Sequence, residues 1–518
     1  MRRALRADRP SRLLGGRPRV SGSTTLAAPT EGWDTETPVQ ELPQTRCRRI
    51  ENFIPRGVSL EMRRGSADHA TGMPASVDTL MAYNAGVTST LFAASGTAIY
   101  NVTGAGAVGA AVVTGLTNAR FSSVNFATSG GNFLWVCNGA DAPRHWNGTV
   151  WALPTLTGVT ATSIFWVCES KQRLFFLFNN SMSFGYLPVE QIAGAVSTFN
   201  LGSVMSRGGR LVAIGTFTTD GGAGQDDYTA FLSSQGEVAI YAGVNPASAT
   251  EWSLVGVWFV GEPIGDRPLV ELDGDLGVIT RNGLVPVAQV MGSNEALEGV
   301  RHLTGRIATP YRDSVAVAGA LNGWQGLFYP GADWLLINAP TTPPVQYVRH
   351  AVTQGWTLFT GMAATCWALF AGRLFFGRAD GRVCVADAGY ADRGADIVGN
   401  IETAWTALGS RGANKRLAAA RPIVTTETGA AVAMVARVDY DATPPLPAAP
   451  LGTLSNALIL GSGQLDVHVL GGIDLGTRQW RSISGVGSVV SMALQAVSRQ
   501  SRFALNGIDI IYEAGGPI

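Results

Sequence analysis

Short hairpin patterns recur about every 45 residues along the chain, from near residue 77 to near residue 408. In each pattern an alternating apolar run reaches a Gly, Asn or Asp turn and continues into a second apolar run. The segments that show it are 89–100, 131–146, 173–186, 227–241, 270–287, 326–338 and 372–386. Alternation with a period of two predicts strands, and evenly spaced hairpins are typical of sheets arranged around one axis. The pattern therefore predicts an all-β chain whose body is a β-propeller of about six to seven blades.

Turn residues divide this body, 77–408, into blades. Asn-Gly or Asp-Gly pairs punctuate it at Asn138-Gly139, Asn147-Gly148, Asp220-Gly221, Asn282-Gly283, Asn322-Gly323 and Asp380-Gly381. Such pairs tolerate the positive φ of tight hairpin turns, so each is expected at a hairpin tip. The predicted blades are 77–123, 124–166, 167–217, 222–262, 263–305, 321–360 and 361–408. Helical periodicity is nearly absent, with 189–195 and 294–300 as brief helix candidates.

The two ends of the chain differ from the repeats. Residues 1–28 form a basic arm with seven arginines, and 29–76 is a mostly extended, proline-containing connector. Within the connector, alternation over 58–62 predicts one strand with one buried face. Residues 409–518 are predicted to form a separate antiparallel β domain, with strands near 431–440, 464–470, 489–497 and 502–512. We expect the last of these strands to turn at Asn506-Gly507.

Composition and charge narrow the class of protein. Hydrophobic residues make up 46% of the chain and charged residues 15%, a balance that excludes a disordered chain and a coiled coil. The formal net charge is zero, although only Lys171 and Lys415 are lysines and every other basic residue is arginine. A GC-rich genome explains this bias, and a neutral total argues against a dedicated nucleic-acid binder, which needs a basic surface.

The cysteines and the N-terminus bear on the cellular compartment. Cys47, Cys137, Cys168, Cys366 and Cys384 lack close spacing, so we expect reduced thiols that behave as small apolar groups. The first residues lack the apolar core of a secretory signal, and no stretch reaches 18 apolar residues, so no membrane-spanning segment is expected. We interpret the basic arm as a solvated segment, with an arginine-rich transit peptide as the alternative.

The chain carries no strong catalytic or metal-binding motif. HExxH, P-loop, GxSxG and zinc-ligand spacings are absent. The weaker candidates are Asp273-Gly274-Asp275 for calcium, Asp226, Asp227 and Glu271 for glycoside hydrolysis, and Gly104, Gly106 and Gly109 as a dinucleotide loop. Ordinary hairpin turns explain these better, because further calcium ligands, a distinctive carboxylate spacing and a βαβ unit are missing. We therefore expect no enzyme, no catalytic residue, no cofactor and no metal.

Segments near both ends resemble one protein family. Residues 32–74 have a Gly-Trp entry, an Asn-Phe-Ile-Pro stretch and a strand that ends in Arg-Arg-Gly. Residues 480–488, WRSISGVGS, precede closing strands at 503–513, FALNGIDIIYE, and a Gly-Gly end at Gly515 and Gly516. These features resemble the tail nozzle, or tail-tubular-protein-B-like, family of short-tailed bacteriophages, the podoviruses. With the repeats between them, the resemblance covers the chain after the arm.

The resemblance implies a structural virion protein without catalytic residues. Such a subunit assembles as a homohexameric ring below the portal and adaptor rings, and it binds other tail proteins such as fibres and a spike or needle. Genomic DNA is ejected through the lumen without sequence-specific binding. The protein is then made in the cytoplasm of the bacterial host and ends in the virion tail. Two alternatives stay open: a propeller that binds or cleaves receptor carbohydrates, and another tail or baseplate component.

Overall fold

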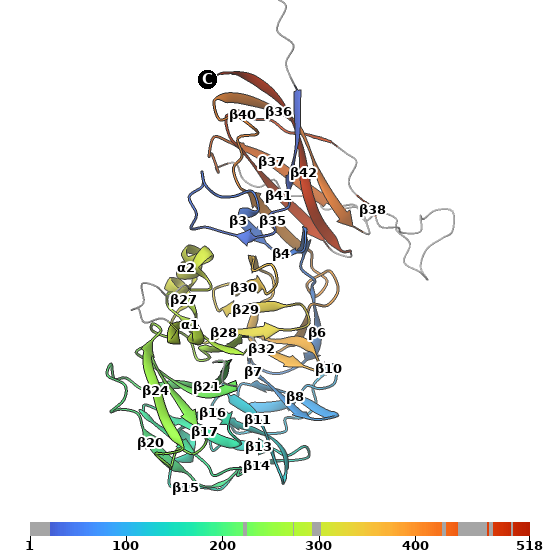
Figure 1. Cartoon of the computed structure of the whole chain (residues 1–518). Helices are drawn as coiled ribbons and strands as arrows, with labels where there is room; N and C mark the ends of the chain where they lie inside the picture. The colour runs from blue at the N-terminus through green and yellow to red at the C-terminus, as the bar shows by residue number, and fades with distance from the viewer. Residues whose placement is uncertain are drawn as a thin grey trace, which may run out of the picture.

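The strands gather in two units, a propeller in the lower half of Figure 1 and a β-sandwich in the upper half. The computed structural model describes residues 21–220, 225–272, 274–292, 302–426, 431–443, 474–475, 480–498 and 501–517. The predicted all-β fold, with a propeller body and a C-terminal antiparallel β unit, is confirmed. The first and last described residues both lie in the sandwich, far from the base of the propeller (Figure 1).

The first four blades are antiparallel meanders that follow one another along the chain. Their strands are β7 (Val77–Ala85), β8 (Thr88–Ser95) and β9 (Ala98–Asn101) in blade 1, β11 (Ser122–Thr128), β12 (Gly131–Cys137), β13 (Arg144–Trp146) and β14 (Trp151–Ala152) in blade 2, β16 (Ile164–Ser170), β17 (Arg173–Phe178), β18 (Ser183–Tyr186) and β20 (Ser197–Asn200) in blade 3, and β21 (Leu211–Asp220), β22 (Gln225–Ser233), β23 (Glu237–Gly243) and β24 (Trp252–Phe259) in blade 4. A small parallel pair, β15 (Leu156–Thr157) with β19 (Gly194–Ala195), lies outside them.

Three further blades close the ring. They contain β25 (Leu269–Leu272), β26 (Asp275–Thr280) and β27 (Gly283–Pro286) in blade 5, β28 (Gln325–Tyr329), β29 (Trp334–Ala339), β30 (Val345–His350) and β31 (Trp356–Phe359) in blade 6, and β32 (Ala364–Phe370), β33 (Arg373–Arg378) and β34 (Val383–Ala386) in blade 7. The first strand of each blade lies against the first strand of the next, and β32 returns to β7. The described residues therefore form a seven-bladed propeller, at the upper end of the predicted range.

The N-terminal segment supplies the outer strand of blade 7. β6 (Ser66–Thr71) pairs antiparallel with β34, and β10 (Gly106–Ala107) pairs in parallel with β6. A strand from before blade 1 thus completes the last blade, which fastens the ring between segments about 300 residues apart in sequence. The predicted connector is in fact divided between the two units, because its other strands belong to the sandwich.

The sandwich is built from two sheets. One sheet contains β1 (Ser21–Ala27), β4 (Phe53–Arg56), β5 (Ser59–Met62), β36 (Ala413–Thr426), β38 (Asp474–Leu475), β39 (Arg481–Ser482), β40 (Val486–Gly487) and β42 (Phe503–Pro517). The other continues blade 6 through β31 into β2 (Gly32–Trp33), β3 (Arg46–Glu51), β35 (Ile397–Thr403), β41 (Val490–Ser498) and β37 (Ala431–Val438). One apolar core runs through both sheets and into blades 5 and 6, joining the two units.

Several sequence predictions about the sandwich need correction. β35 lies within 77–408 but pairs with β3 and β41, so the propeller ends before residue 397. The predicted turn at Asn506-Gly507 is wrong, because β42 runs through it and pairs there with β1 and β36. β1 lies in the predicted arm, and β36 was not predicted. The strand expected at 464–470 lies outside the described residues.

The turn predictions hold where two strands are adjacent. Asn147-Gly148, Asn282-Gly283 and Asp380-Gly381 lie between paired strands, and Gly381 has a φ of +72°. Asn138-Gly139 begins a longer loop between β12 and β13. The prediction at Asn322-Gly323 is wrong, because this pair precedes β28 and no strand lies directly before it. Gly221 of the remaining pair lies outside the described residues.

The helices were not found by the sequence patterns. They are α1 (Val287–Met291), α2 (Ala308–Ala318), and the short 3₁₀ segments η1 (Ala161–Ser163) and η3 (Gly305–Ile307). α2 buries Tyr311, Val315 and Ala318 on one face, but its small alanines and alternating valines resemble a strand. The helix predicted at 189–195 is wrong, since this segment ends in β19, and 294–300 lies outside the described residues.

Candidate functional site

A buried arginine joins the propeller to the sandwich. The Arg63 side chain is 1% exposed; its Nε donates to Asn52 Oδ1 at 2.8 Å and its Nη2 to the Thr360 carbonyl at 2.5 Å. Nη1 donates to Asp392 Oδ1 at 3.0 Å, and Nη2 bonds the second Asp392 oxygen. We call Asn52, Arg63, Thr360 and Asp392 the neck. Arg63 follows β5, Thr360 links blades 6 and 7, and Asp392 lies between blade 7 and β35, so one guanidinium ties both units together.

Asn52 completes the neck from the other side. Its backbone has a φ of +57°, a region that asparagine tolerates better than most residues. Nδ2 donates to Thr360 Oγ1 and to the Val398 carbonyl, both at 2.8 Å, and Oδ1 accepts from the Thr360 N–H at 2.9 Å. Each polar atom of this side chain is therefore used, which is what a buried amide requires.

Glycines of the same N-terminal segment allow close backbone approach at this joint. A Cβ on Gly65 would lie 2.0 Å from the Ala391 carbonyl oxygen. Gly32 has a φ of +76°, and a Cβ there would lie 2.6 Å from the Trp356 carbonyl oxygen. Next to it, Trp33 stacks on Tyr347 of blade 6 with ring centroids 6.3 Å apart. The residues that carry the N-terminal resemblance thus converge on the joint between the units.

The C-terminal segment of the resemblance is clamped within the sandwich. Asp439 accepts from the Ser488 N–H at 2.7 Å and from Ser488 Oγ at 2.9 Å. Lys415 is nearly buried, and its Nζ donates to the carbonyls of Ser488 and Ser410. Trp480 receives the Arg421 guanidinium over its ring, 4.7 Å from the centroid. These contacts give the residues of this segment a structural role, because they hold its turns against β36.

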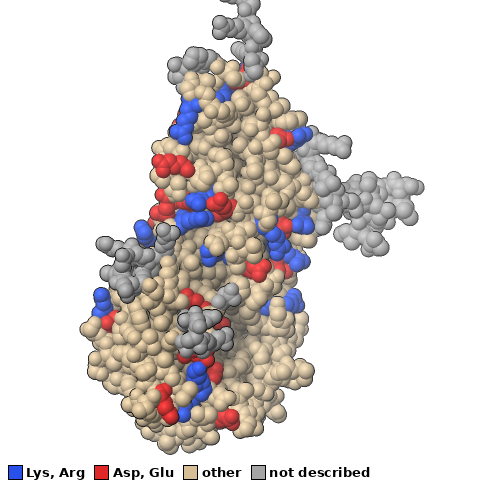
Figure 2. Space-filling model, viewed as in Figure 1, with Lys and Arg blue, Asp and Glu red and all other residues tan. Residues whose placement is uncertain are grey.

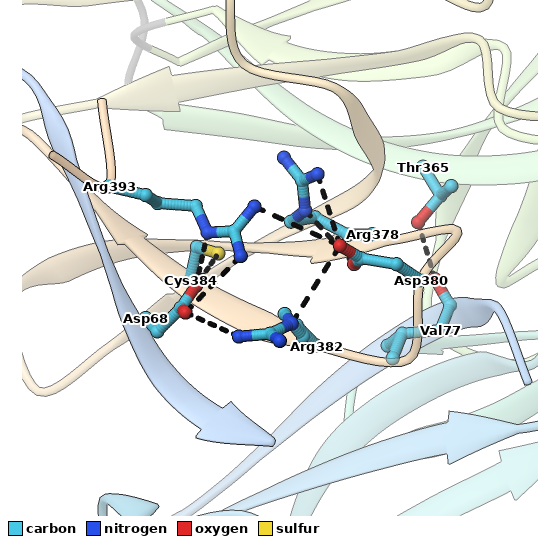
Figure 3. Close-up of polar contacts among 8 residues, drawn as sticks. All are labelled: Asp68, Val77, Thr365, Arg378, Asp380, Arg382, Cys384 and Arg393. Atoms are coloured by element: carbon cyan, nitrogen blue, oxygen red, sulfur yellow. Dashed lines mark hydrogen bonds and ion pairs between the residues drawn. The ribbon is translucent and has the colours of Figure 1, made fainter. Parts of the chain in front are cut away.

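Ion pairs fasten β6 to blade 7 (Figure 3). Asp68 of β6 accepts from Arg393 Nε at 2.5 Å and from Arg382 Nη1 at 2.6 Å. Asp380 receives two bonds from Arg378, at 3.0 and 3.2 Å, and lies 3.8 Å from both other arginines. Burial alone would raise the pKa of Asp68, but hydrogen bonds from Arg393, Cys384 and Arg382 outweigh it and lower that pKa. We call Asp68, Asp380, Arg378, Arg382 and Arg393 the closure cluster.

The closure cluster predicts a measurable acid sensitivity. The lowered pKa of Asp68 means that its contribution is present above its unfolded pKa, near 3.8, and is lost as the pH falls through the lower folded value. We expect Asp68→Asn to destabilise the protein by about 1 kcal/mol at pH 7, because these pairs are partly solvated. Urea titrations at several pH values should show this difference shrinking below about pH 4. Asp313→Asn, at an exposed position on α2, is the matched control; an equal effect of both variants would contradict the role of Asp68.

A shallow hollow lies beside the closure cluster. It has a volume of about 480 Å³ and is lined by Ser66, Ala67, Asp68, Ala388, Gly389, Tyr390, Ala391, Arg393 and Gly394. Its charged groups, Asp68 and Arg393, already pair with each other. The hollow therefore offers a ligand little free hydrogen-bonding capacity.

The propeller axis is crossed by Arg267, which precedes β25 of blade 5. Its Nη2 donates to the Asp78 carbonyl at 3.0 Å and to Thr79 Oγ1 at 2.8 Å, both on β7 of blade 1. Its Nη1 reaches Gln325 Oε1 of blade 6 at 3.4 Å. Blades 1 and 5 are not neighbours in the ring, so this side chain reaches across its centre.

Among the described residues, the weak chemical candidates lie on separate strands and loops. Asp227 pairs with Lys171 Nζ at 2.5 Å, and this hydrogen bond, with one from Thr218, lowers its pKa. Glu271 lies on β25 in another blade, and nothing is described for the Asp226 side chain or for Asp273. The glycines at 104, 106 and 109 lie in an exposed loop around β10.

The titratable side chains of the described ranges show no metal-binding cluster. No group of three or more His, Cys, Asp or Glu side chains there could hold a metal ion, and no helix there is long and apolar enough to span a membrane. His69, His145, His302 and His350 lie on separate elements, and His468 falls outside those ranges. All five cysteines are free, and burial raises the pKa of each, to about 12 for Cys168 and about 11 for Cys366.

Sequence reasoning missed Arg63, Asp392, Asp68 and Arg267 as joining residues. No local signal marked Arg63, because it falls on the polar side of the alternation, with Ser59 and Glu61. Their partners are up to 329 residues away, so no local pattern could indicate the pairings.

Comparisons with known proteins concern the fold only. No protein family matches the sequence, and no curated protein does. Among solved structures, BBS1N in complex with ARL6DN is 11% identical, covers 64% of this chain and 99% of its own, and has a TM-score of 0.42. YCF48 bound to a peptide is 11% identical, covers 67% of this chain and 99% of its own, and has a TM-score of 0.38. At this level of similarity nothing about activity or partners is transferred.

Proposed function

We propose that this chain is a structural subunit of a bacteriophage tail nozzle, which assembles as a homohexameric ring and passes genomic DNA during ejection. The proposal rests on one observation, that the residues of the N-terminal resemblance meet at the neck. The segment that resembles the nozzle family supplies Asn52, Arg63 and Gly65, and the contacts of these residues hold the propeller and sandwich together. A ring that bears the force of DNA passage needs rigid two-unit subunits, and the continuous core supports that rigidity.

In this proposal the conduit is the lumen of the ring and not the axis of each propeller. Arg267 spans that axis with bonds to two other blades, so the propeller acts as a solid building block. DNA passes without sequence-specific contacts, because a conduit must accept every sequence. The proposed partners are the portal-adaptor ring and other tail proteins, and the proposed location is the virion tail.

The mass of the purified full-length protein tests this proposal. We expect mass photometry to show a species near 326 kDa, six times the 54.3 kDa chain. A ring seen by negative-stain electron microscopy would support a head-to-tail assembly. A protein that stays monomeric at all concentrations would contradict the proposal. A monomer that releases sugars from host glycans would instead favour the carbohydrate-cleaving alternative.

A further inference from the structure

Charged residues are nearly missing from blades 1 and 2 and from the start of blade 3. Residues 77–168 contain four, Asp78, Arg120, Asp141 and Arg144, although 15% of the whole chain is charged, which corresponds to about fourteen in a stretch of this length. No ion pair within the described residues includes a side chain from 77–168. In Figure 2 the side of the propeller that carries β8, β11 and β13 in Figure 1 is almost free of blue and red.

Three of these four charged residues are only partly exposed. Asp141 accepts from the Thr117 N–H at 2.8 Å and from Asn138 Nδ2 at 2.6 Å, which organises two loops. Asp78 accepts from Ser76 Oγ at 2.7 Å beside the axis, and the Nε atom of Arg144 is buried. Only Arg120 is exposed. The surface of the two blades therefore carries few charges.

The same blades expose apolar side chains. Val87 and Val150, at the tips of the β7–β8 and β13–β14 hairpins, are 106% and 55% exposed, and Val112 and Leu153 add 42% and 55%. The two tips belong to one surface, because a Cβ on Gly148 would lie 3.0 Å from the Tyr83 hydroxyl of blade 1. We call Val87 and Val150, with the tips that carry them, the uncharged face. Soluble surfaces are normally about a quarter to a third charged, whereas the centre of a protein interface is depleted of charge.

A second surface of this kind is the outer edge of blade 4. β24 pairs with β23 on one side only, and its sequence, WSLVGVWF, contains no charge and no proline. Leu254 and Val255 are 43% and 42% exposed, and Val244, just beyond β23, is 51% exposed. Natural edge strands are usually protected by charges, prolines or bulges. β24 has a bulge at Val255, but the bulge leaves an apolar side chain exposed. We call Val244, Leu254 and Val255 the apolar edge.

We propose that the uncharged face of one copy packs against the apolar edge of the next copy. A charged partner would lose hydration on the uncharged face without gaining a counter-charge, so the partner surface must itself lack charge. β24, which supplies Leu254 and Val255 of the apolar edge, carries no charged residue. The two surfaces differ, and β8 and β24 lie on opposite sides of the propeller in Figure 1, so a contact between them is head-to-tail and builds a ring when its rotation closes. This inference rests on the proposed ring and names its contact surfaces.

Charge insertion in the full-length protein tests the contact. We expect two variants to raise the dissociation constant of the ring at least tenfold by mass photometry, the double change Val87→Glu/Val150→Glu and the single change Leu254→Glu. Each variant buries an unpaired charge in the contact. The matched control is Val58→Glu/Val352→Glu, which changes two valines that are 86% and 75% exposed on hairpins of the sandwich and blade 6. We expect this control to assemble as the unchanged protein does. Circular dichroism should show all variants folded, since each altered side chain is exposed.

A charge pair tests whether the two surfaces meet. Combining Val150→Lys with Leu254→Glu in one chain should restore assembly relative to either change alone, since the contact places opposite charges together. Rings that survive Val87→Glu/Val150→Glu, or that are lost equally in the control, would overturn this inference while leaving the proposed function intact. Loss of rings in both single-surface variants without recovery in the charge pair would overturn the head-to-tail pairing. An unchanged protein that never forms rings would overturn the proposed function itself.

Discussion

Replacing Arg63 with methionine is expected to destabilise the protein by about 3 to 5 kcal/mol, because the change leaves a buried carboxylate without its partner. The Asp392 side chain is 12% exposed and receives two bonds from Arg63. Asn52 Oδ1 and the Thr360 carbonyl also lose a donor. Methionine fills a similar volume, so the loss reports the polar contacts and not a large cavity.

Urea denaturation, followed by tryptophan fluorescence, measures this effect. Arg56→Met is the matched control, because Arg56 is 51% exposed and its bond to Glu61 is 3.4 Å long. We expect the control to change stability by less than about 1 kcal/mol. The double variant Arg63→Met/Asp392→Asn should lose less than the sum of the two single changes, since it leaves no ionised carboxylate in the neck. Equal losses for Arg63→Met and Arg56→Met would contradict the joining role of Arg63.

The repeat architecture was predictable because its signals are local. Alternation and turn residues lie within each hairpin, and all seven predicted hairpin segments contain paired strands, such as β33 and β34 in 372–386. The predicted blade starts fall within about six residues of the observed first strands, except that blade 4 begins at Leu211 and not at 222. Asp220 ends β21 and pairs with Gln225 of β22, so the Asp-Gly signal there lies within a blade and not between two blades. Such patterns need no information about the rest of the chain.

Long-range pairing was not predictable from the same patterns. β6 completes blade 7 by pairing with β34, more than 300 residues away. Nothing in the sequence of β6, SADHAT, indicates β34 as its partner. β42 passes through Asn506-Gly507 because two neighbouring strands hold it extended, so tertiary pairing overrides a strong turn signal. β35 looks like another blade strand, yet it belongs to the sandwich.

The sequence indicated which segment contributes to the candidate site, but it did not indicate the contacts that the segment makes. The resemblance pointed to the segment that contains Asn52, Arg63 and Gly65, but it assigned no contact to any of them. Their partners, Thr360 and the loop at Ala391 and Asp392, come from links between blade 7 and its neighbours. A buried arginine cannot be told from an exposed one by its neighbours in sequence when its counter-ion lies in another unit.

Replacing Gly65 with alanine is expected to cost about 3 kcal/mol, near the upper end for overpacking. The added Cβ would lie 2.0 Å from the Ala391 carbonyl oxygen and 2.5 Å from its carbon, and backbone atoms cannot rotate away as a flexible side chain does. The loop that follows blade 7 must then move, which disturbs Asp392 and with it the Arg63 pair. Hydrogen exchange should therefore increase in 388–394 before it increases elsewhere.

The matched control for this prediction is Gly104→Ala. A Cβ at Gly104 meets nothing within 4 Å, and neither glycine needs a positive φ, so the two changes differ in steric surroundings. We expect the control to stay within about 0.5 kcal/mol of the unchanged protein in urea denaturation. Because Gly65 and Arg63 act on the same loop, combining Gly65→Ala with Arg63→Met should cost less than the two changes separately. Equal stability of Gly65→Ala and Gly104→Ala would show that this approach of two backbones does not hold the units together.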